Sequence, residues 1–335
     1  MANRDVLAIG TSAGGVEALT FLANSFRPDF PAAVLVTIHL PSQFRSSLDE
    51  ILSRAGPLPA AFANNGEAMK KARIYIAPPG SHLIVDGDQL LLGVGPRENH
   101  ARPAIDPMLR STAVCCAHRA VGVVLTGTLG DGASGLWTLG HLGGMTVVQD
   151  PGDAAFPEMP LTALNRAQPD HVVPLADLPK LLERAVHQPA SEPQPVPETI
   201  KYEVELARSG RASMEDMDRI GRRSVLSCPD CGGVMWEIDE GNLTRYRCHV
   251  GHAYTDELMH LAVDESLRRA LASAARALDE RVALVHKLEA RAAGTGHNQL
   301  AQSWARRRHE LDHEADIIDE AIQRLDRMVA KSAAE

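Results

Sequence analysis

The chain has 335 residues, of which 44% are hydrophobic and 23% are charged, with a formal net charge of -9 and five cysteines. This composition is typical of a folded protein of about two domains, and its acidic balance argues against a surface that binds nucleic-acid phosphates. No apolar run approaches the roughly 20 residues of a membrane-spanning helix, and the first residues do not resemble a secretory signal. We therefore expect a cytoplasmic protein without membrane insertion.

Short apolar runs rich in valine and isoleucine alternate with amphipathic stretches up to about residue 188. This alternation predicts an α/β fold with a doubly wound, mainly parallel sheet. Asp86 and Gly87 stand between two short apolar runs and predict a β-hairpin at the rim. The expected core strands are 6–10, 32–38, 72–77, 121–127 and 144–149, and the expected helices are 16–24, 107–118, 132–141 and 175–186.

Residues 10–14, GTSAG, fit the G-x-S-x-G pattern, in which a tight strand-to-helix turn projects a serine. A dinucleotide-binding loop is the rival interpretation. That loop needs a glycine where Ser12 stands and an acidic residue near the end of the second strand, and residues 31–40 contain none. The pattern therefore favours a nucleophile over a phosphate-binding loop.

A histidine and an aspartate stand where partners of Ser12 are needed: His39 ends the second strand, and Asp131 follows the strand 121–127. The carboxyl ends of parallel strands share one edge of the sheet, so the three side chains are expected together. His39 would take the serine proton, Asp131 would orient the imidazole, and the backbone amide of Ala13 would help bind an oxyanion. Taken singly, each also has an ordinary role in a cap, a turn or a strand end.

The first domain resembles the catalytic domain of the CheB-type chemotaxis protein-glutamate methylesterases over about residues 5–188. The resemblance implies that Ser12, His39 and Asp131 form a catalytic triad. It also implies hydrolysis of glutamate γ-methyl esters on methyl-accepting chemoreceptors, in some members deamidation of glutamine, through an acyl-enzyme and without a cofactor. The matching stretches are IGTSAGG, IHLP, IYIAPPGSHL, RPAIDPMLRS, VVLTGTLGDGASG, and VVQDP followed by FPEMP.

Two arginines of the RPAIDPMLRS stretch, Arg102 and Arg110, are candidates by charge for binding an acidic receptor helix. Surface or salt-bridge roles are equally ordinary for them. The chain departs from the family pattern at Ala13, where threonine is common, and at Thr128 and Leu129 in the stretch that commonly reads T-G-M-G-x-D-G. Family members also commonly begin with a receiver domain, whereas the first expected strand here lies close to Met1. We therefore expect control by a partner, control by the carboxyl-terminal extension, or no control of the activity.

The cysteine-rich segment predicts a structural zinc site. Cys228 and Cys231 form a C-x-x-C pair, and Cys248 follows with His249 or His252. Four such ligands are typical of a closed zinc ribbon, and His252 is preferred because its side chain has room to turn back. A reduced cluster without metal is the alternative. The surrounding charges are of mixed sign, which favours a protein partner over nucleic acid.

The expected domains are the esterase domain 1–188, a proline-rich linker 189–226, the zinc-ribbon-like unit 227–258 and a helical hairpin 259–335. The apolar stripes of the two final helices predict packing against each other, although the same stripes would suit a homodimer. The stripe residues are Leu271, Ala274, Leu278, Val282 and Val285, followed by Leu300, Trp304, Leu311, Ala315, Ile318, Ile322 and Leu325.

The sequence thus predicts a serine hydrolase of the protein-glutamate methylesterase type, with glutaminase activity as an accompanying option. Two alternatives stay open. One is a non-catalytic signalling or interaction protein that uses the ribbon and the hairpin. The other is an esterase or amidase for a different acyl substrate.

Overall fold

A computed structural model describes residues 3–40, 46–210, 213–240 and 243–332. Pro41 of the IHLP stretch lies outside these residues. The chain forms two compact units, which divide between Met259 and His260.

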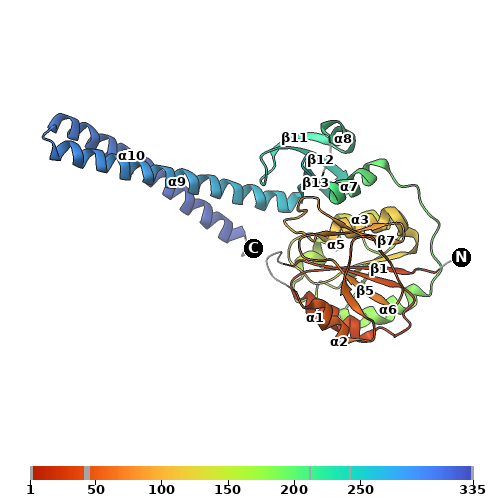
Figure 1. Cartoon of the computed structure of the whole chain (residues 1–335). Helices are drawn as coiled ribbons and strands as arrows, with labels where there is room; N and C mark the ends of the chain where they lie inside the picture. The colour runs from red at the N-terminus through yellow and green to blue at the C-terminus, as the bar shows by residue number, and fades with distance from the viewer. Residues whose placement is uncertain (1–2, 41–45, 211–212, 241–242, 333–335) are drawn as a thin grey trace. The chain divides into compact units, whose positions relative to one another are not determined.

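The first unit is built on a seven-stranded sheet with the order β10-β9-β8-β1-β2-β5-β3, in which every neighbouring pair is parallel (Figure 1). All five predicted core strands belong to it. The strands are β1 (Val6–Thr11), β2 (Ala33–Ile38), β3 (Ala60–Phe62), β5 (Arg73–Ile76), β8 (Ala120–Val124), β9 (Met145–Gln149) and β10 (His171–Val173).

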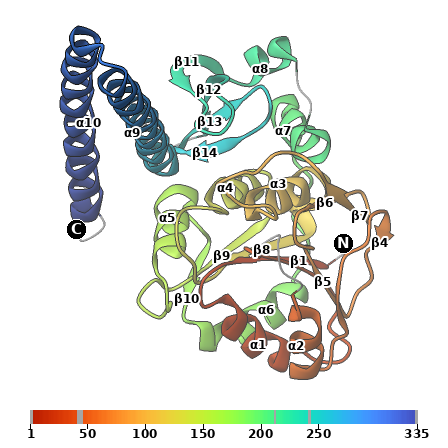
Figure 2. The ribbon, with the colours of Figure 1, turned by 60° about the vertical axis from the view of Figure 1, so that its left-hand side comes forward.

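Helices cover both faces of this sheet, as Figure 2 shows. Alternate residues of β1 face opposite ways: Leu7 and Ile9 pack with the first set of helices, and Val6 and Ala8 pack with the second. The predicted doubly wound α/β fold is thereby confirmed. The first set is α1 (Gly15–Ser25), α2 (Leu48–Ala55) and α6 (Leu178–Val186), and the second is α3 (Ile105–Cys116), α4 (Ala133–His141) and α5 (Glu158–Ala167). Two short 3-10 helices, η1 (Ala117–Arg119) and η2 (Leu175–Asp177), complete this part.

The predicted hairpin is present in a small antiparallel sheet with the order β4-β7-β6. Its turn contains Gly87 at φ +61°, a left-handed conformation that glycine adopts without strain. The strands are β4 (Glu67–Ala68), β6 (His82–Asp86) and β7 (Gln89–Gly93).

The segment expected as a linker is only partly one. Its proline-rich beginning has no helix or strand, whereas α7 (Glu198–Ser209), α8 (Met214–Ile220) and β11 (Arg222–Ser227) follow. Helix α7 packs on α3, β6 and β7, and its Leu206 and Ala207 are buried. Burial of this face explains why these residues fold against the α/β core.

Strands β11, β12 (Val234–Glu240), β13 (Leu243–Cys248) and β14 (Ala253–Thr255) form a four-stranded antiparallel sheet, here called the ribbon sheet. Trp236 of β12 is fully buried against α8, and its indole N–H donates to Asp218 at 2.8 Å. The cysteine-rich segment therefore has a hydrophobic core of its own.

The second unit consists of most of α9 (Asp256–Gly294) and of α10 (Asn298–Ser332), which lie side by side in Figure 1. Ion pairs join Arg308 to Glu289 at 3.0 Å and Arg268 to Asp326 at 2.9 Å, so the helices are antiparallel. Val285 and Leu311 of the predicted stripes are buried, whereas Leu300 is exposed. None of the described helices has the length and apolar character needed to cross a bilayer.

Candidate active site

The turn between β1 and α1 places Ser12 at the carboxyl edge of the large sheet. Gly14 adopts φ +72° just before the helix. A Cβ atom on Gly15 would lie 2.4 Å from the Thr11 hydroxyl oxygen. The two glycines after Ser12 are therefore needed for a turn this tight.

Hydrogen bonds from the end of β8 hold this turn in place. The Ser12 N–H donates to the Thr126 carbonyl at 3.1 Å, and the Thr126 hydroxyl donates to the Ala13 carbonyl at 3.0 Å. The N–H of Phe156 in turn donates to the Thr126 hydroxyl at 2.9 Å. The FPEMP stretch, which begins at Phe156, thus supports the serine from outside the sheet.

The structure brings Ser12, His39 and Asp131 together. Ser12 Oγ lies 3.0 Å from His39 Nδ1, and His39 Nε2 lies 2.7 Å from Asp131 Oδ2. The side chain of His39 is 21% exposed and that of Asp131 is 1% exposed. The hydrogen-bond contact expected between Ser12 and His39 is present. Asp131, at one end of these contacts, is buried, and Ser12, at the other end, is partly exposed.

The charge state of Asp131 assigns the imidazole hydrogen. Burial opposes ionisation, but the hydrogen bond and charge of His39, aided by the N–H of Ile105 and by Asn99, lower the pKa of Asp131 below its ordinary value. An ionised carboxylate only accepts, so the hydrogen sits on Nε2 of His39. Nδ1 is then the acceptor that faces the Ser12 hydroxyl.

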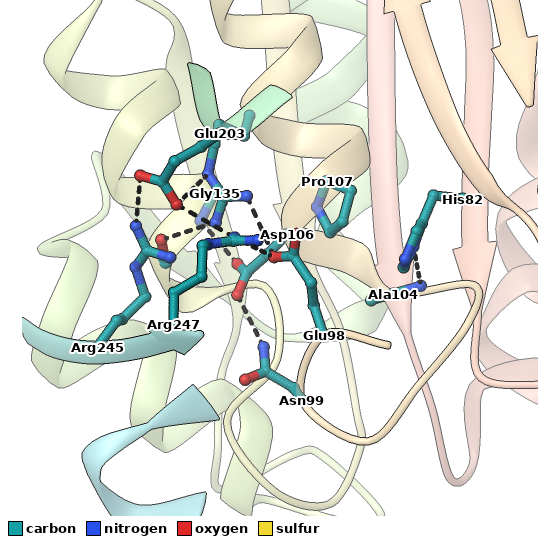
Figure 3. Close-up of polar contacts among 12 residues, drawn as sticks. His82, Glu98, Asn99, Ala104, Asp106, Pro107, Gly135, Glu203, Arg245 and Arg247 are labelled. Carbon is teal, nitrogen blue, oxygen red and sulfur yellow. Dashed lines mark hydrogen bonds and ion pairs between the residues drawn. The ribbon is translucent and has the colours of Figure 1, made fainter. Parts of the chain in front are cut away.

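Two further buried residues, Asn99 and Asp106, complete the surroundings of Asp131. The Asn99 amide donates to Asp131 Oδ1 and to Asp106 Oδ2, both at 2.9 Å, and Figure 3 shows the contact with Asp106. Burial and the charge of Asp131 raise the pKa of Asp106 to about 7. Neither residue was predicted as part of the site: Asn99 belongs to no motif and follows no strand of the large sheet, and Asp106 lies inside the RPAIDPMLRS stretch without a feature that marks it.

Ala13 directly follows Ser12 and is partly exposed. Within the described residues, its N–H has no hydrogen-bond acceptor. An unpaired N–H beside a nucleophile is the type of donor that binds an oxyanion. The alanine side chain itself supplies no donor.

The two candidate arginines differ in position. Arg102 donates to the Val94 and Gly95 carbonyls at 3.3 and 2.7 Å and is partly exposed. Arg110 is fully buried and forms an ion pair with Glu98 at 3.2 Å. Because the Arg110 side chain is buried and paired with Glu98, it presents no surface to a receptor helix.

The four predicted metal ligands also cluster: the ligand atoms of Cys228, Cys231, Cys248 and His252 all lie within 4.8 Å of one another. The Cys231 and Cys248 sulfurs are 3.7 Å apart, and His252 Nδ1 lies 3.5 and 3.7 Å from the Cys248 and Cys228 sulfurs. Tetrahedral zinc with its usual bond lengths gives edges of about 3.8 Å between sulfurs and about 3.6 Å between sulfur and nitrogen. The donor set therefore fits a zinc ion, with His252 as the histidine.

Comparison with known proteins adds to this geometry. The sequence model of a family described as CheB methylesterase matches residues 7–182. The chain is 34% identical over 186 residues to protein-glutamate methylesterase/protein-glutamine glutaminase 2 of Shewanella denitrificans, covering 54% of this chain and 53% of that protein. It is 38% identical over 174 residues to the corresponding enzyme 1 of Xanthomonas campestris pv. campestris, covering 51% and 48%.

A solved structure shares the fold. The crystal structure of the Thermotoga maritima CheB methylesterase catalytic domain superposes with a TM-score of 0.52 and 28% identity, covering 55% of this chain and 99% of that domain. The chain spans about half the length of the two relatives named above. The similarity therefore concerns the large sheet and its helices.

Proposed function

Because the chain belongs to the CheB methylesterase family, we propose that it is a serine hydrolase that removes methyl groups from glutamate γ-methyl esters of chemoreceptors. The observation that carries the proposal is the chain of contacts from Ser12 Oγ to His39 Nδ1 at 3.0 Å and from His39 Nε2 to Asp131 at 2.7 Å. Both relatives are named protein-glutamate methylesterase/protein-glutamine glutaminase, which supports glutamine deamidation as a second activity of the same site.

Each proposed step follows from one of these contacts. Ser12 Oγ attacks the ester carbonyl carbon while its proton passes to His39 Nδ1, and Asp131 stabilises the imidazolium that forms. The Ala13 N–H donates to the oxyanion of the tetrahedral intermediate. The imidazolium of His39 then gives its proton to the departing methoxide oxygen, which leaves as methanol, or to the departing amide nitrogen of a glutamine, which leaves as ammonia. His39 finally takes a proton from the water that attacks the acyl-enzyme and releases the carboxylate and the free Ser12 hydroxyl.

The test uses the full chain and a methylated cytoplasmic fragment of a chemoreceptor, with methanol release as the measurement. Ser12→Ala should abolish release, whereas Ser25→Ala, an exposed serine in the last turn of α1, should leave it unchanged. If the unmodified chain releases no methanol yet hydrolyses an activated ester through Ser12, the substrate is a different acyl compound. If Ser12→Ala has no effect on any ester, the enzyme proposal is wrong and a binding role is favoured.

We also propose that Cys228, Cys231, Cys248 and His252 hold a structural zinc ion. The ion would have four protein ligands and would supply no catalysis, because no coordination position stays open for a substrate. Metal analysis of the purified chain should give about one zinc per chain, and Cys228→Ser should lower that content. Near-ultraviolet circular dichroism should report loss of the buried Trp236 environment on chelation. A zinc content below half an equivalent, with an unchanged spectrum, would contradict the site.

A further inference from the structure

We propose that the ribbon sheet holds Asn99 in place and that Asn99 positions Asp131, so that the extension outside the esterase domain forms part of the active-site support. This inference rests on the proposed function. It concerns the 98–101 loop, made of Glu98, Asn99, His100 and Ala101, which precedes α3. Asn99 is a positioning residue in this proposal because it contacts Asp131 and not the reacting atoms.

The 98–101 loop has a conformation that its residues do not favour by themselves. Asn99 and His100 are consecutive non-glycine residues with φ of +50° and +63°. Two hydrogen bonds close the loop, from Glu98 N–H to Ala101 O at 3.2 Å and from Ala101 N–H to Glu98 O at 2.9 Å. Left-handed conformations at such residues persist only where surrounding contacts fix them.

Those surrounding contacts come from the ribbon sheet. The Asn99 N–H donates to the Ala253 carbonyl of β14 at 2.8 Å, and Glu98 pairs with Ala253 as a parallel bridge. The His100 ring meets the Tyr254 ring edge to face at 5.2 Å. Strand β14 therefore extends along the backbone of the loop and fixes its path.

An ion pair ties the loop to the neighbouring strand as well. Arg247 of β13 lies 2.9 Å from Glu98, and both side chains are at most 1% exposed (Figure 3). Arg110 of α3 lies 3.2 Å from the same Glu98 oxygen. A buried carboxylate between two arginines is strongly fixed, because either partner left alone would be an unpaired buried charge.

The side chain of Asn99 connects this restrained loop to Asp131 of the proposed triad. Its amide nitrogen has two hydrogens, and one donates to Asp131 while the other donates to Asp106. No other side-chain amide among the described residues contacts Asp131. Without the Asn99 side-chain amide, the buried carboxyl groups of Asp106 and Asp131 would face each other with fewer hydrogen-bond donors. Asp131, which accepts from His39, would also lose one of the contacts that fix its position.

The test measures the rate at which a fluorophosphonate labels Ser12, as a function of pH. In this reaction the Oγ–P bond forms, the P–F bond breaks and the serine proton passes to His39. Asn99→Asp replaces a donor by a third carboxylate, so the midpoint of the pH profile should move upward by about half a unit or more. Asn99→Gly keeps the left-handed backbone but lacks the amide, and its labelling should be about tenfold slower at all pH values.

Asn65→Asp is the matched control, because it introduces the same charge at an exposed turn before β4. Its midpoint and rate should equal those of the unmodified chain. Equal profiles for the chain and both Asn99 variants would overturn the inference and leave the proposed function intact. A chain that is not labelled at Ser12 at all would overturn both.

A second measurement tests the ribbon itself. Tyr254→Leu removes the ring that meets His100, whereas Tyr254→Phe keeps that ring and loses only the hydroxyl that donates to Asp230 at 2.6 Å. Hydrogen exchange at the backbone N–H of Asn99 should be about tenfold faster in Tyr254→Leu, and the rate of Ser12 labelling should fall in parallel. In Tyr254→Phe both rates should stay near those of the unmodified chain. Faster exchange without slower labelling, or unchanged exchange in Tyr254→Leu, would contradict the proposal.

Discussion

At the scale of single residues, Asp131 is held more completely than either of its proposed partners. Its Oδ1 accepts from Asn99 and from the N–H groups of Asp106 and Gly132 at 2.9, 3.2 and 2.9 Å. Its Oδ2 accepts from His39 and from the Ile105 N–H at 2.7 and 2.6 Å. Because every contact is a donor, the site is built for a group that only accepts, an ionised carboxylate.

Asp131→Asn should therefore damage both chemistry and stability. The new amide NH2 must face N–H donors in either orientation, and it leaves His39 without the acceptor that fixes its tautomer. We expect kcat for ester hydrolysis to fall by about 10³ to 10⁴-fold and the free energy of unfolding to fall by about 1–3 kcal/mol. Methanol release and urea unfolding measure the two effects.

Asp170→Asn is the control for this substitution, since Asp170 also accepts two hydrogen bonds, from the N–H and hydroxyl of Thr146 at 2.8 and 2.9 Å. It should lower stability without lowering kcat. Equal kcat values for Asp131→Asn and the unmodified chain would contradict the role of Asp131.

Asp106 should make stability depend on pH. Its ordinary pKa is 3.8 and its pKa in the folded chain is about 7. Between these values the folded chain holds a proton that the unfolded chain has released. The resulting stabilisation is complete below about pH 4 and is lost as pH rises through about 7.

Comparison with Asp106→Asn isolates this effect, because the variant does not titrate there. The unfolding free energy of the unmodified chain minus that of the variant should fall by up to about 1.4 kcal/mol per pH unit between about pH 5 and about pH 7. Urea unfolding at several pH values measures it. Altered hydrogen bonds give a constant offset, so a difference that does not change with pH would refute the expectation.

At this scale, the sequence allowed prediction of the proposed triad but not of its support. Ser12, His39 and Asp131 each follow a strand, which a sequence reveals. Asn99 acts through a loop in left-handed conformation and through contacts with β14, more than 150 residues later in the chain. Neither property leaves a periodic or motif signal.

At the scale of elements, the arrangement of three strands determines the site. Strand β1 pairs with β2 on one side and with β8 on the other. Their carboxyl ends therefore deliver Ser12, His39 and the loop of Asp131 to adjacent points of one edge. The core strands were predictable because buried parallel strands are continuous apolar runs.

Helix α7 shows where pattern reasoning failed. Its buried face includes Glu203 beside Ile200, Leu206 and Ala207, so its apolar period is interrupted by a charge. The preceding prolines then made the whole segment look like a linker. The helix is stabilised by contacts with α3, β6 and β7 that the local sequence does not show.

The loop that follows β8 comes close to the Ser12 turn at Gly127, which gives a further prediction. A Cβ there would lie 2.6 Å from Met159 Cε and 2.9 Å from Ser12 Cβ. The methionine can move, but the serine is fixed by its turn, so Gly127→Ala should displace Ser12. We expect kcat to fall by about tenfold or more, with a loss of about 1–3 kcal/mol in the free energy of unfolding.

Gly152→Ala is the matched control, since its Cβ would meet only the Asp150 carboxylate oxygen, at 3.3 Å. Ester hydrolysis by this variant should match that of the unmodified chain. If Gly127→Ala also retains full kcat, the tight packing around Ser12 is not needed for its reactivity.

At the scale of the whole molecule, buried charges join the extension to the α/β core. Glu203 of α7 lies 2.8 Å from Arg245, 3.1 Å from Arg247 and 3.9 Å from Arg110. Two of these arginines belong to the ribbon sheet and one to α3 of the α/β core. Charged side chains are rarely buried, so a sequence indicates the separate parts of such a chain but not the buried ion pairs that join them.

Glu203→Gln should destabilise the contact between α7, α3 and the ribbon sheet far more than the loss of an exposed ion pair would. The loss of one buried carboxylate leaves three arginines with less compensation, and we expect the free energy of unfolding to fall by about 3–5 kcal/mol. Glu205→Gln on the same helix is the control, because Glu205 pairs with Arg208 at 2.8 Å and both are about half exposed. Its effect should stay below about 1 kcal/mol.

Salt distinguishes the two variants further. Raising NaCl from about 0.05 to about 0.5 M should abolish the small effect of Glu205→Gln and leave that of Glu203→Gln nearly unchanged, since buried pairs are poorly screened. The chain has tryptophans at 137, 236 and 304, so the fluorescence of Trp236 is followed in a background in which Trp137 and Trp304 are replaced by phenylalanine. In this background, with Glu203 intact, urea unfolding followed by Trp236 fluorescence and by loss of ester hydrolysis should give one transition. In Glu203→Gln the ribbon should unfold first. Coincident transitions in that variant, with a loss no larger than that of Glu205→Gln, would mean that apolar contacts alone join the extension to the core.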